Sequence, residues 1–341
     1  MSGTQSTPIA PGTDVLVTGA TGFTGSYLVR RLVDEGLSVR AIARHTSNVE
    51  PFEGLPIRWF RGEIYDSVLV REAMHDVRYV FHLAACYRDP KAATDEYAKV
   101  HVHSTKLLAR EALQNPTFAR FIHTSTIGVH GHVARPPADE ESPYSPGDAY
   151  QDTKLEAEQW LRKFASDNSL PFTIVRPAAI FGPGDRRLLK LFKFAERGWC
   201  PLLDRHNTLY HLIHVEDLTR FYLNVATHSA ALSEVFICGN ESPTDIRSIV
   251  DTVGEFLGKK PRYVSFPSRP MFMLADFSER LCKVLNVAPI LYRRRLAFFT
   301  KDRSFDTRKS RRLLNFTCRF DNTSGLLQTA EAYVRKGWIR R

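Results

Sequence analysis

The sequence of 341 residues lacks the features that mark membrane, secreted or disulfide-built proteins. No run of eighteen apolar residues occurs, and Met1 to Gly12 have neither the charged start nor the apolar stretch of a signal peptide. The five cysteines are scattered, odd in number and without a CxxC pair, which is typical of reduced thiols. We therefore expect a cytoplasmic protein without an integral membrane segment, and a disordered N-terminus over residues 1–12.

Acidic residues are in the minority. The sequence has 47 Lys and Arg and 37 Asp and Glu, so the formal net charge is +10. Basic residues become more frequent towards the C-terminus. Charge alone is weak evidence for nucleic-acid binding, and no recognised nucleic-acid motif accompanies it. We expect a small-molecule substrate and no nucleic acid as partner. With 43% hydrophobic residues, the chain can bury one large core, or a large and a small one.

A strand–turn–helix pattern lies near the start of the chain. The apolar run 14–18 breaks at Gly19, and helical spacing resumes around Gly22 and Gly25. Gly19 would free the φ of the turn, Gly22 would let the backbone approach a pyrophosphate, and Gly25 would let the helix pack close to the strand. Unpaired N–H groups at the helix start favour an anion. The pattern predicts a dinucleotide site that includes Gly19, Thr21, Gly22, Phe23, Thr24 and Gly25.

Strands and helices continue to alternate after this turn. Further strands are predicted at 38–44, 57–62, 78–83, 121–126 and 171–177. Such alternation indicates an α/β fold, a Rossmann-type doubly wound parallel sheet. We expect the dinucleotide-binding domain over residues 13–180. A smaller C-terminal α/β substrate domain is expected over 181–341, with some of its segments returning to the sheet.

The GxxGxxG spacing within Thr18–Gly25 resembles that of the extended short-chain dehydrogenase/reductase superfamily, in particular its epimerase/dehydratase and 3β-hydroxysteroid-dehydrogenase-like branches. The resemblance runs from about residue 14 to the C-terminus, since residues 62–66 resemble the family's GDxxD turn and 181–185 its GPGD turn. It implies an NAD(P)-dependent enzyme and leaves a homodimer open. The cofactor contacts that it implies along the chain are Glu63, Ile64, Leu83, Ala84, Ala85 and Pro177.

The end of the second strand bears on the choice of nucleotide. An acidic residue there would bind the adenosine ribose of NAD, whereas an arginine can accept a 2′-phosphate. In the family the acid falls about where Ala43 stands, and Arg44 follows it. The missing acid favours NADP(H), with Arg44 on the phosphate. The alternative is an NAD site with Arg44 as an ordinary surface side chain.

Tyr150 and Lys154 are four residues apart and share one face of a predicted helix. An ammonium beside a phenol favours the phenolate, so Tyr150 could take or give a proton near neutral pH. Lys154 would also bind the nicotinamide ribose, so both belong to the predicted cofactor contacts. About two dozen residues earlier a predicted strand ends in hydroxyls, at the edge where ligands bind in parallel sheets. The resemblance gives the catalytic hydroxyl to Thr126, with Ser125 as the near alternative.

One departure from the family concerns the helix before that strand. Relatives carry Asn-Val-x-Gly-Thr there, and this chain has His101 in place of the asparagine, which puts the proton relay in question. His101 and His103 point to different faces of a helix, and His130 and His132 have no carboxylate or thiol at a suitable spacing. No metal site is therefore predicted.

The expected activity is hydride transfer between nicotinamide and a secondary alcohol or ketone of sterol, hopanoid or polyketide kind. Tyr210 and His211 stand where nucleotide-sugar epimerases usually carry a diphosphate-binding arginine, and the apolar stretch 271–285 predicts a helix packed over the substrate pocket. The first alternative is a nucleotide-sugar epimerase or dehydratase with retained NAD, anchored through Arg293–Arg295. The second is a non-catalytic dinucleotide-binding regulator, which the Tyr–Lys pair disfavours.

Overall fold

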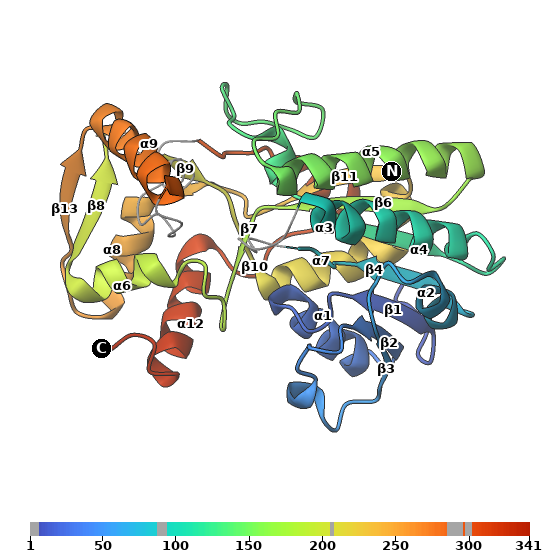
Figure 1. The fold of residues 1–341 in the computed structure, drawn as a ribbon. Helices are drawn as coiled ribbons and strands as arrows, with labels where there is room; N and C mark the ends of the chain where they lie inside the picture. The colour runs from blue at the N-terminus through green and yellow to red at the C-terminus, as the bar shows by residue number, and fades with distance from the viewer. Residues whose placement is uncertain (1–6, 87–93, 205–207, 285–295, 297–301) are drawn as a thin grey trace.

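A seven-stranded parallel sheet forms the centre of the larger part of the molecule (Figure 1). The computed structural model describes residues 7–86, 94–204, 208–284, 296 and 302–341. The strand order is β11-β6-β5-β4-β1-β2-β3, and every neighbouring pair is parallel. The strands span Asp14–Thr18 (β1), Ser38–Ala43 (β2), Ile57–Arg61 (β3), Tyr79–His82 (β4), Arg120–Thr124 (β5), Phe172–Pro177 (β6) and Glu234–Cys238 (β11).

This order confirms the doubly wound Rossmann-type sheet. From β1 the chain moves outward through β2 and β3 on one side, and through β4, β5 and β6 on the other. The change of direction leaves a crevice outside the carboxyl ends of β1 and β4, which is where such sheets bind dinucleotides.

Helices cover both faces of the sheet. Because side chains alternate along a strand, Val15 and Val17 face α1 (Phe23–Asp34) and α7 (Val215–Thr227), whereas Leu16 faces the opposite layer. That layer consists of α2 (Ser67–Met74), α4 (Ser104–Ala112) and α5 (Ala149–Asn168). Both α7 and β11 come after residue 181, so segments from the second half of the chain complete the larger part.

The helix expected to run from about residue 94 to 113 contains an irregular turn. It begins as α3 (Thr94–Ala98), continues as a π-helical turn η2 (Lys99–His103) and ends as α4. A π-helical turn carries one extra residue and is often found at functional sites.

The expectation of disorder over residues 1–12 is wrong for residues 7–12, which are ordered in the structure. Ile9 is buried in the core beside α1 and α7, and the Gly12 N–H donates to the Gly36 carbonyl at 2.8 Å. Burial of the Ile9 side chain ties this segment to the larger part. Residues 1–6 lie outside the described residues.

The smaller part has its own core and lies at the left of Figure 1. Short strand pairs support it: β7 (Ala179–Phe181) with β10 (Leu212–His214), β9 (Leu209–Tyr210) with β12 (Thr244–Asp245), and β8 (Trp199–Leu203) with β13 (Arg262–Phe266). Its helices are α6 (Leu189–Arg197), α8 (Ile246–Phe256), α9 (Ser268–Val284) and α12 (Asn322–Arg335). The remaining short helices are η1 (Glu50–Phe52), η3 (Ile127–His130), η4 (Ser229–Ala231) and α11 (Arg308–Leu314).

The apolar stretch at 271–285 is helical as far as Val284, and its side chains divide between two environments. Met271 and Phe272 pack in a small cluster with Leu203, Ala275 and Leu296. Three others face outward, with exposed fractions of 72% for Met273, 55% for Leu274 and 65% for Phe277. Packing over a substrate pocket stays a prediction. No helix within the described ranges has both the length and the apolarity needed to span a bilayer.

Candidate active site

The glycine turn after β1 has a geometry that only glycine permits. Gly19 adopts φ +72°, and a Cβ there would lie 2.9 Å from the Ala84 nitrogen. A Cβ on Gly25 would lie 2.0 Å from the Gly19 carbonyl oxygen. The turn, the start of α1 and the backbone after β4 are therefore in close contact.

The first turn of α1 has no side-chain cap, although other helices in the protein do. Asp66, Asp148, Asp245 and Asp321 cap α2, α5, α8 and α12, respectively, whereas α1 begins at Gly22 without a side-chain acceptor. Its first N–H groups face the crevice with the positive end of the helix dipole. This arrangement fits the pyrophosphate of a dinucleotide.

Thr18 joins the ends of β1 and β4. Its Oγ1 accepts hydrogen bonds from the Leu83 and Ala84 N–H groups, each at 3.1 Å, and lies 2.8 Å from His82 Nδ1. These bonds hold Leu83, Ala84 and the adjoining Ala85 next to the glycine turn. The predicted cofactor contacts in the glycine turn and in residues 83–85 therefore lie at one edge of the sheet.

The turn after β2 places Arg44 at the surface of the same edge. Arg44 is exposed, and its carbonyl accepts from the Ser47 N–H at 3.0 Å. From the end of β3, Arg61 Nη2 donates to the carbonyls of His45 at 2.9 Å and Ser47 at 3.0 Å. Arg61 therefore fixes the backbone of the turn that carries Arg44, a role that the sequence alone did not suggest.

The predicted adenine contacts follow β3. Ile64 is buried and Glu63 is partly exposed. Asp66, which ends this turn, accepts from the N–H groups of Val68 and Leu69 and so starts α2. Pro177 ends β6, next to β5, and is buried.

Lys154 connects α5 to the ends of two strands. Its side chain is buried, and Nζ donates to the Thr124 carbonyl at 2.9 Å and towards the Ala84 carbonyl at 3.4 Å. Burial lowers the pKa of this ammonium to about 7. Tyr150, one turn earlier on α5, is half-buried, with its ring centroid 5.3 Å from that of His101.

Of the two candidate hydroxyls, Thr126 is the more accessible. Thr126 is half-buried, and its Oγ1 accepts from the Gly128 N–H at 3.0 Å. Ser125 is buried, and its Oγ has no partner among the described residues. Gln151 packs against Gly128, where a Cβ would lie 3.2 Å from its Nε2, so the first turn of α5 lies beside the turn after Thr126. The structure therefore gathers Thr126, Tyr150 and Lys154 at the carboxyl end of β5.

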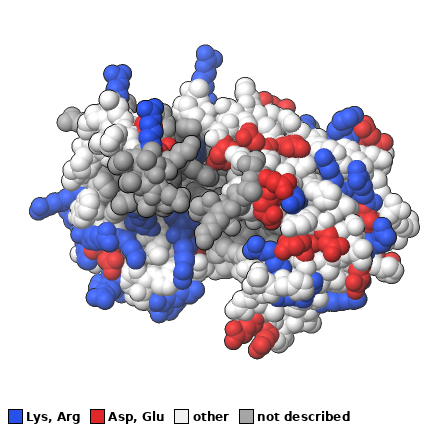
Figure 2. All heavy atoms as spheres, in the orientation of Figure 1, with Lys and Arg blue, Asp and Glu red and all other residues white. Residues whose placement is uncertain are grey.

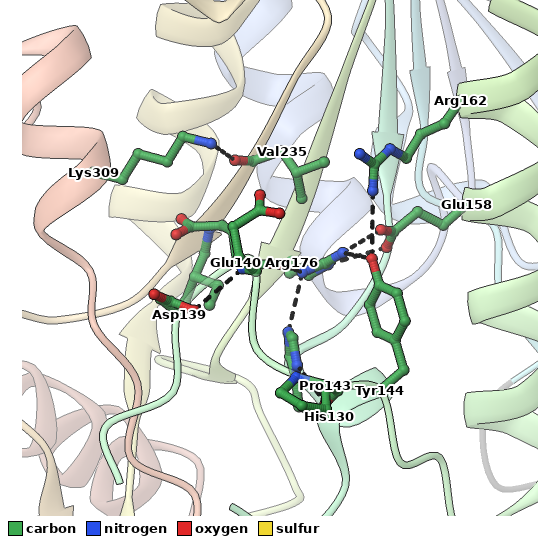
Figure 3. A network of polar contacts seen from close by, with 12 residues as sticks. His130, Asp139, Glu140, Pro143, Tyr144, Glu158, Arg162, Arg176, Val235 and Lys309 are labelled. Atoms are coloured by element: carbon green, nitrogen blue, oxygen red, sulfur yellow. Dashed lines mark hydrogen bonds and ion pairs between the residues drawn. The ribbon is translucent and has the colours of Figure 1, made fainter. Parts of the chain in front are cut away.

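The sequence reasoning missed a buried ion pair behind this face of α5 (Figure 3). Arg176 on β6 donates through Nε to Glu158 Oε2 at 3.1 Å, and through Nη2 to Glu158 Oε1. The same guanidinium donates to the Glu140 carbonyl at 2.8 Å and the Tyr144 hydroxyl at 2.8 Å, and contacts His130 Nε2 at 3.0 Å. It thereby fastens the loop before α5 to the sheet. Two signals were available: an arginine inside a buried strand, and a glutamate four residues after Lys154.

Tyr210 and His211 do not provide a cation. Both are buried in the described structure. His211 Nδ1 accepts from the Phe305 N–H at 3.2 Å, so the ring proton is on Nε2, 2.6 Å from the Asn240 carbonyl oxygen. Burial also lowers the pKa of His211, which keeps the ring neutral.

Comparison with known proteins agrees with this geometry. The model of the "NAD dependent epimerase/dehydratase family" matches residues 15–239, most of the chain. The chain belongs to this family. It is an NAD(P)-dependent enzyme of the extended short-chain dehydrogenase/reductase type, which confirms the family resemblance of the glycine spacing.

Three proteins that are similar to this chain have different described activities. Sterol demethylase protein B of Methylococcus capsulatus is 37% identical over 175 residues, which cover 50% of this chain and 53% of that protein. The decarboxylating sterol-4-alpha-carboxylate 3-dehydrogenase of Saccharomyces cerevisiae is 27% identical, over 92% of this chain and 96% of its own. The crystal structure of the UDP-glucose 4-epimerase of Thermotoga maritima with UDP-glucose has a TM-score of 0.75 at 22% identity, covering 95% of this chain and 99% of its own.

Proposed function

We propose that this enzyme transfers hydride between NADP(H) and a secondary alcohol or ketone of a sterol-like compound. The main support for this proposal is that Thr126, Tyr150 and Lys154 lie close together at the carboxyl end of β5, beside the glycine turn. The bound dinucleotide would supply or accept the hydride at the substrate carbon. The similarity to two proteins that are named as sterol enzymes supports the substrate class.

Each of the three side chains has a distinct task. In the direction of reduction, the Tyr150 phenol gives its proton to the substrate oxygen, and in oxidation the phenolate removes it. Thr126 donates a hydrogen bond to that oxygen, and Ser125, whose hydroxyl is buried, is the less suitable donor. Lys154 stabilises the phenolate by its charge and binds the ribose hydroxyls.

The residues around the crevice fit an NADP(H) site. Arg44 lies exposed on the turn that Arg61 fixes, where its guanidinium can form a charge-assisted contact with a 2′-phosphate. The residues proposed to bind the rest of the cofactor are Gly19, Thr21, Gly22, Phe23, Thr24, Gly25, Glu63, Ile64, Leu83, Ala84, Ala85, Tyr150, Lys154 and Pro177.

The family also contains nucleotide-sugar epimerases, and this is the competing function. A UDP-sugar brings two phosphate charges, and burying them without a matched guanidinium costs several kcal/mol. The neutral, buried Tyr210 and His211 cannot meet that need. The alternative anchor at Arg293–Arg295 lies outside the described residues.

Two measurements test the proposal. Tyr150→Phe should bind NADP(H) as the wild type does, while turnover of a sterol ketone falls by about 10²- to 10⁴-fold, because only the transferable proton is lost. Calorimetry in saturating NADP should show binding of a sterol-like ketone and no micromolar binding of UDP. Equal loss of cofactor binding and turnover in the tyrosine variant would make Tyr150 a structural residue. Micromolar UDP binding that disappears when Arg293–Arg295 are replaced would establish the sugar-nucleotide function instead.

A further inference from the structure

The imidazole of His101 lies between the segment after β4 and helix α5. The proposed reaction needs these two segments in a fixed relative position. His101 is fully buried in the π-helical turn. Its Nε2 accepts from the Cys86 N–H at 3.1 Å, in the segment that follows β4. On the other side, Nδ1 lies 2.8 Å from the Thr153 hydroxyl on α5.

The partners of the ring define its tautomer. Because the Cys86 N–H can only donate, His101 Nε2 carries no proton, and the single ring proton of the neutral imidazole is on Nδ1. The Thr153 hydroxyl donates to the Ala149 carbonyl at 2.7 Å, so its oxygen is available to accept from Nδ1. The hydrogen bonds thus run in one direction, from Cys86 through His101 and Thr153 to the first turn of α5.

The ring stays neutral at working pH. Burial, reinforced by the charge of Lys154, lowers the pKa of His101 to about 2. Protonation would also place a donor opposite the Cys86 N–H. A proton-carrying role near pH 7 is therefore disfavoured by both the hydrogen-bond directions and the burial.

His101 also contacts the proposed acid directly. The His101 and Tyr150 rings meet edge to face, with centroids 5.3 Å apart and planes at 85°. Thr153 lies between Tyr150 and Lys154 on α5. Ordinary core packing would need neither the two directional hydrogen bonds nor a π-helical turn at this position.

We propose that His101 is a positioning residue, which sets Tyr150 relative to the backbone at Ala84–Cys86 and carries no proton itself. This inference rests on the proposed role of Tyr150. An asparagine at this position also has one acceptor and one donor, so it offers the same hydrogen-bonding chemistry from a shorter side chain. The chemistry required of this position is therefore an acceptor on one side and a donor on the other.

The test compares His101→Asn, His101→Leu and Thr153→Val, with His103→Asn as control. His103 lies in the same π-helical turn, is exposed and receives the same substitution. We expect His101→Leu to lower kcat by about 10²-fold through misplacement of the reacting groups, with the Kd for NADP(H) within about threefold of wild type. Thr153→Val, which conserves shape, should lower kcat in the same way even if the leucine variant folds poorly. His101→Asn and His103→Asn should keep kcat within about threefold.

Hydrogen exchange provides a readout that does not require turnover. The amide of Cys86 should exchange faster in His101→Leu and keep its wild-type rate in His101→Asn. The proposal is overturned if the leucine and valine variants keep wild-type kcat, or if the asparagine variant loses as much as the leucine one. A failure of the proposed function can be distinguished from a failure of this inference. If Tyr150 is not the acid, Tyr150→Phe keeps full turnover, whereas the exchange rates at Cys86 still report on His101.

Discussion

Lys154 is a buried cation without a carboxylate partner among the residues that the structure describes. Its Nζ donates to the Thr124 carbonyl and towards the Ala84 carbonyl, and burial lowers its pKa to about 7. Nearby His82 and His101 are neutral, because burial and the charge of Lys154 lower the pKa of His82 to about 3 and that of His101 to about 2. The protein therefore holds this ammonium at a cost to its own stability, as is common at catalytic sites.

Lys154 should make the cofactor-free protein more stable as pH rises. Its folded pKa is lower than the unfolded value, so from about pH 7 to 10.5 the unfolded state binds more protons, and the free energy of unfolding increases by roughly 3 to 5 kcal/mol. Lys154→Met should remove this contribution, seen as a difference in slope between variant and wild type in urea unfolding at several pH values. Lys163→Met, on the exposed side of α5, should keep the wild-type slope. Parallel pH profiles for wild type and Lys154→Met would show that the ammonium is not destabilised by burial.

Arg44 should govern the choice between NADP and NAD. In Arg44→Asp the ratio of NADP to NAD affinity should fall by at least tenfold, about 1.4 kcal/mol, because a charge-assisted contact with the 2′-phosphate is lost. Fluorescence titration with both dinucleotides measures the ratio. Arg58→Asp is the matched control, since this arginine is exposed on β3 and faces Glu72. An unchanged ratio in Arg44→Asp would refute the assignment.

At the scale of elements, α5 carries the proposed acid, the buried lysine and one partner of the buried ion pair on one face. Tyr150, Lys154 and Glu158 follow at intervals of four residues, so they lie along a single stripe. Lys154 reaches the end of β5, and Glu158 pairs with Arg176 on β6 (Figure 3). The ion pair thus fixes the helix that carries the proposed acid.

Breaking this pair should destabilise the fold. Arg176→Met leaves the Glu158 carboxylate buried without a partner, which typically costs about 3 to 5 kcal/mol in the free energy of unfolding. The double variant Arg176→Met with Glu158→Met should lose less than the single one, because no buried charge remains. Urea unfolding of the wild type, both single variants and the double variant gives the four free energies of a double-mutant cycle. A double variant that loses the sum of the single effects would show that the two side chains do not interact.

Local patterns account for what could be predicted from the sequence. The glycine turn, the strand positions and the Tyr150–Lys154 pair each depend on residues close together in the chain, and the structure places them on one edge of the sheet. The contact of His101 with Thr153 could not be predicted, because packing between distant segments determines it. For Arg176 and Glu158 the sequence indicates a buried arginine and a carboxylate on the same helix as Lys154, but not that the two side chains pair. The π-helical turn at Lys99–His103 was also missed.

At the scale of the whole molecule, charge is unevenly distributed. On the face shown in Figure 2, Lys and Arg predominate over the smaller part, and most Asp and Glu lie over the larger part. The net charge of +10 attracts anions over some distance. The two parts are joined by polar contacts such as Tyr27 Oη to the Pro183 carbonyl at 2.7 Å. A homodimer and a cytoplasmic location stay predictions.

Strand β11 is synthesised well after β6, the strand with which it pairs. β6 leaves the ribosome first, then residues 178–233, and only afterwards the strand that pairs with it. In a sheet that lacks β11, β6 is the outer strand. An apolar strand with an unpaired backbone edge is a template for pairing with other chains. Any intermediate in which β6 has paired before β11 is synthesised therefore exposes this backbone edge until Glu234–Cys238 pairs with Phe172–Pro177.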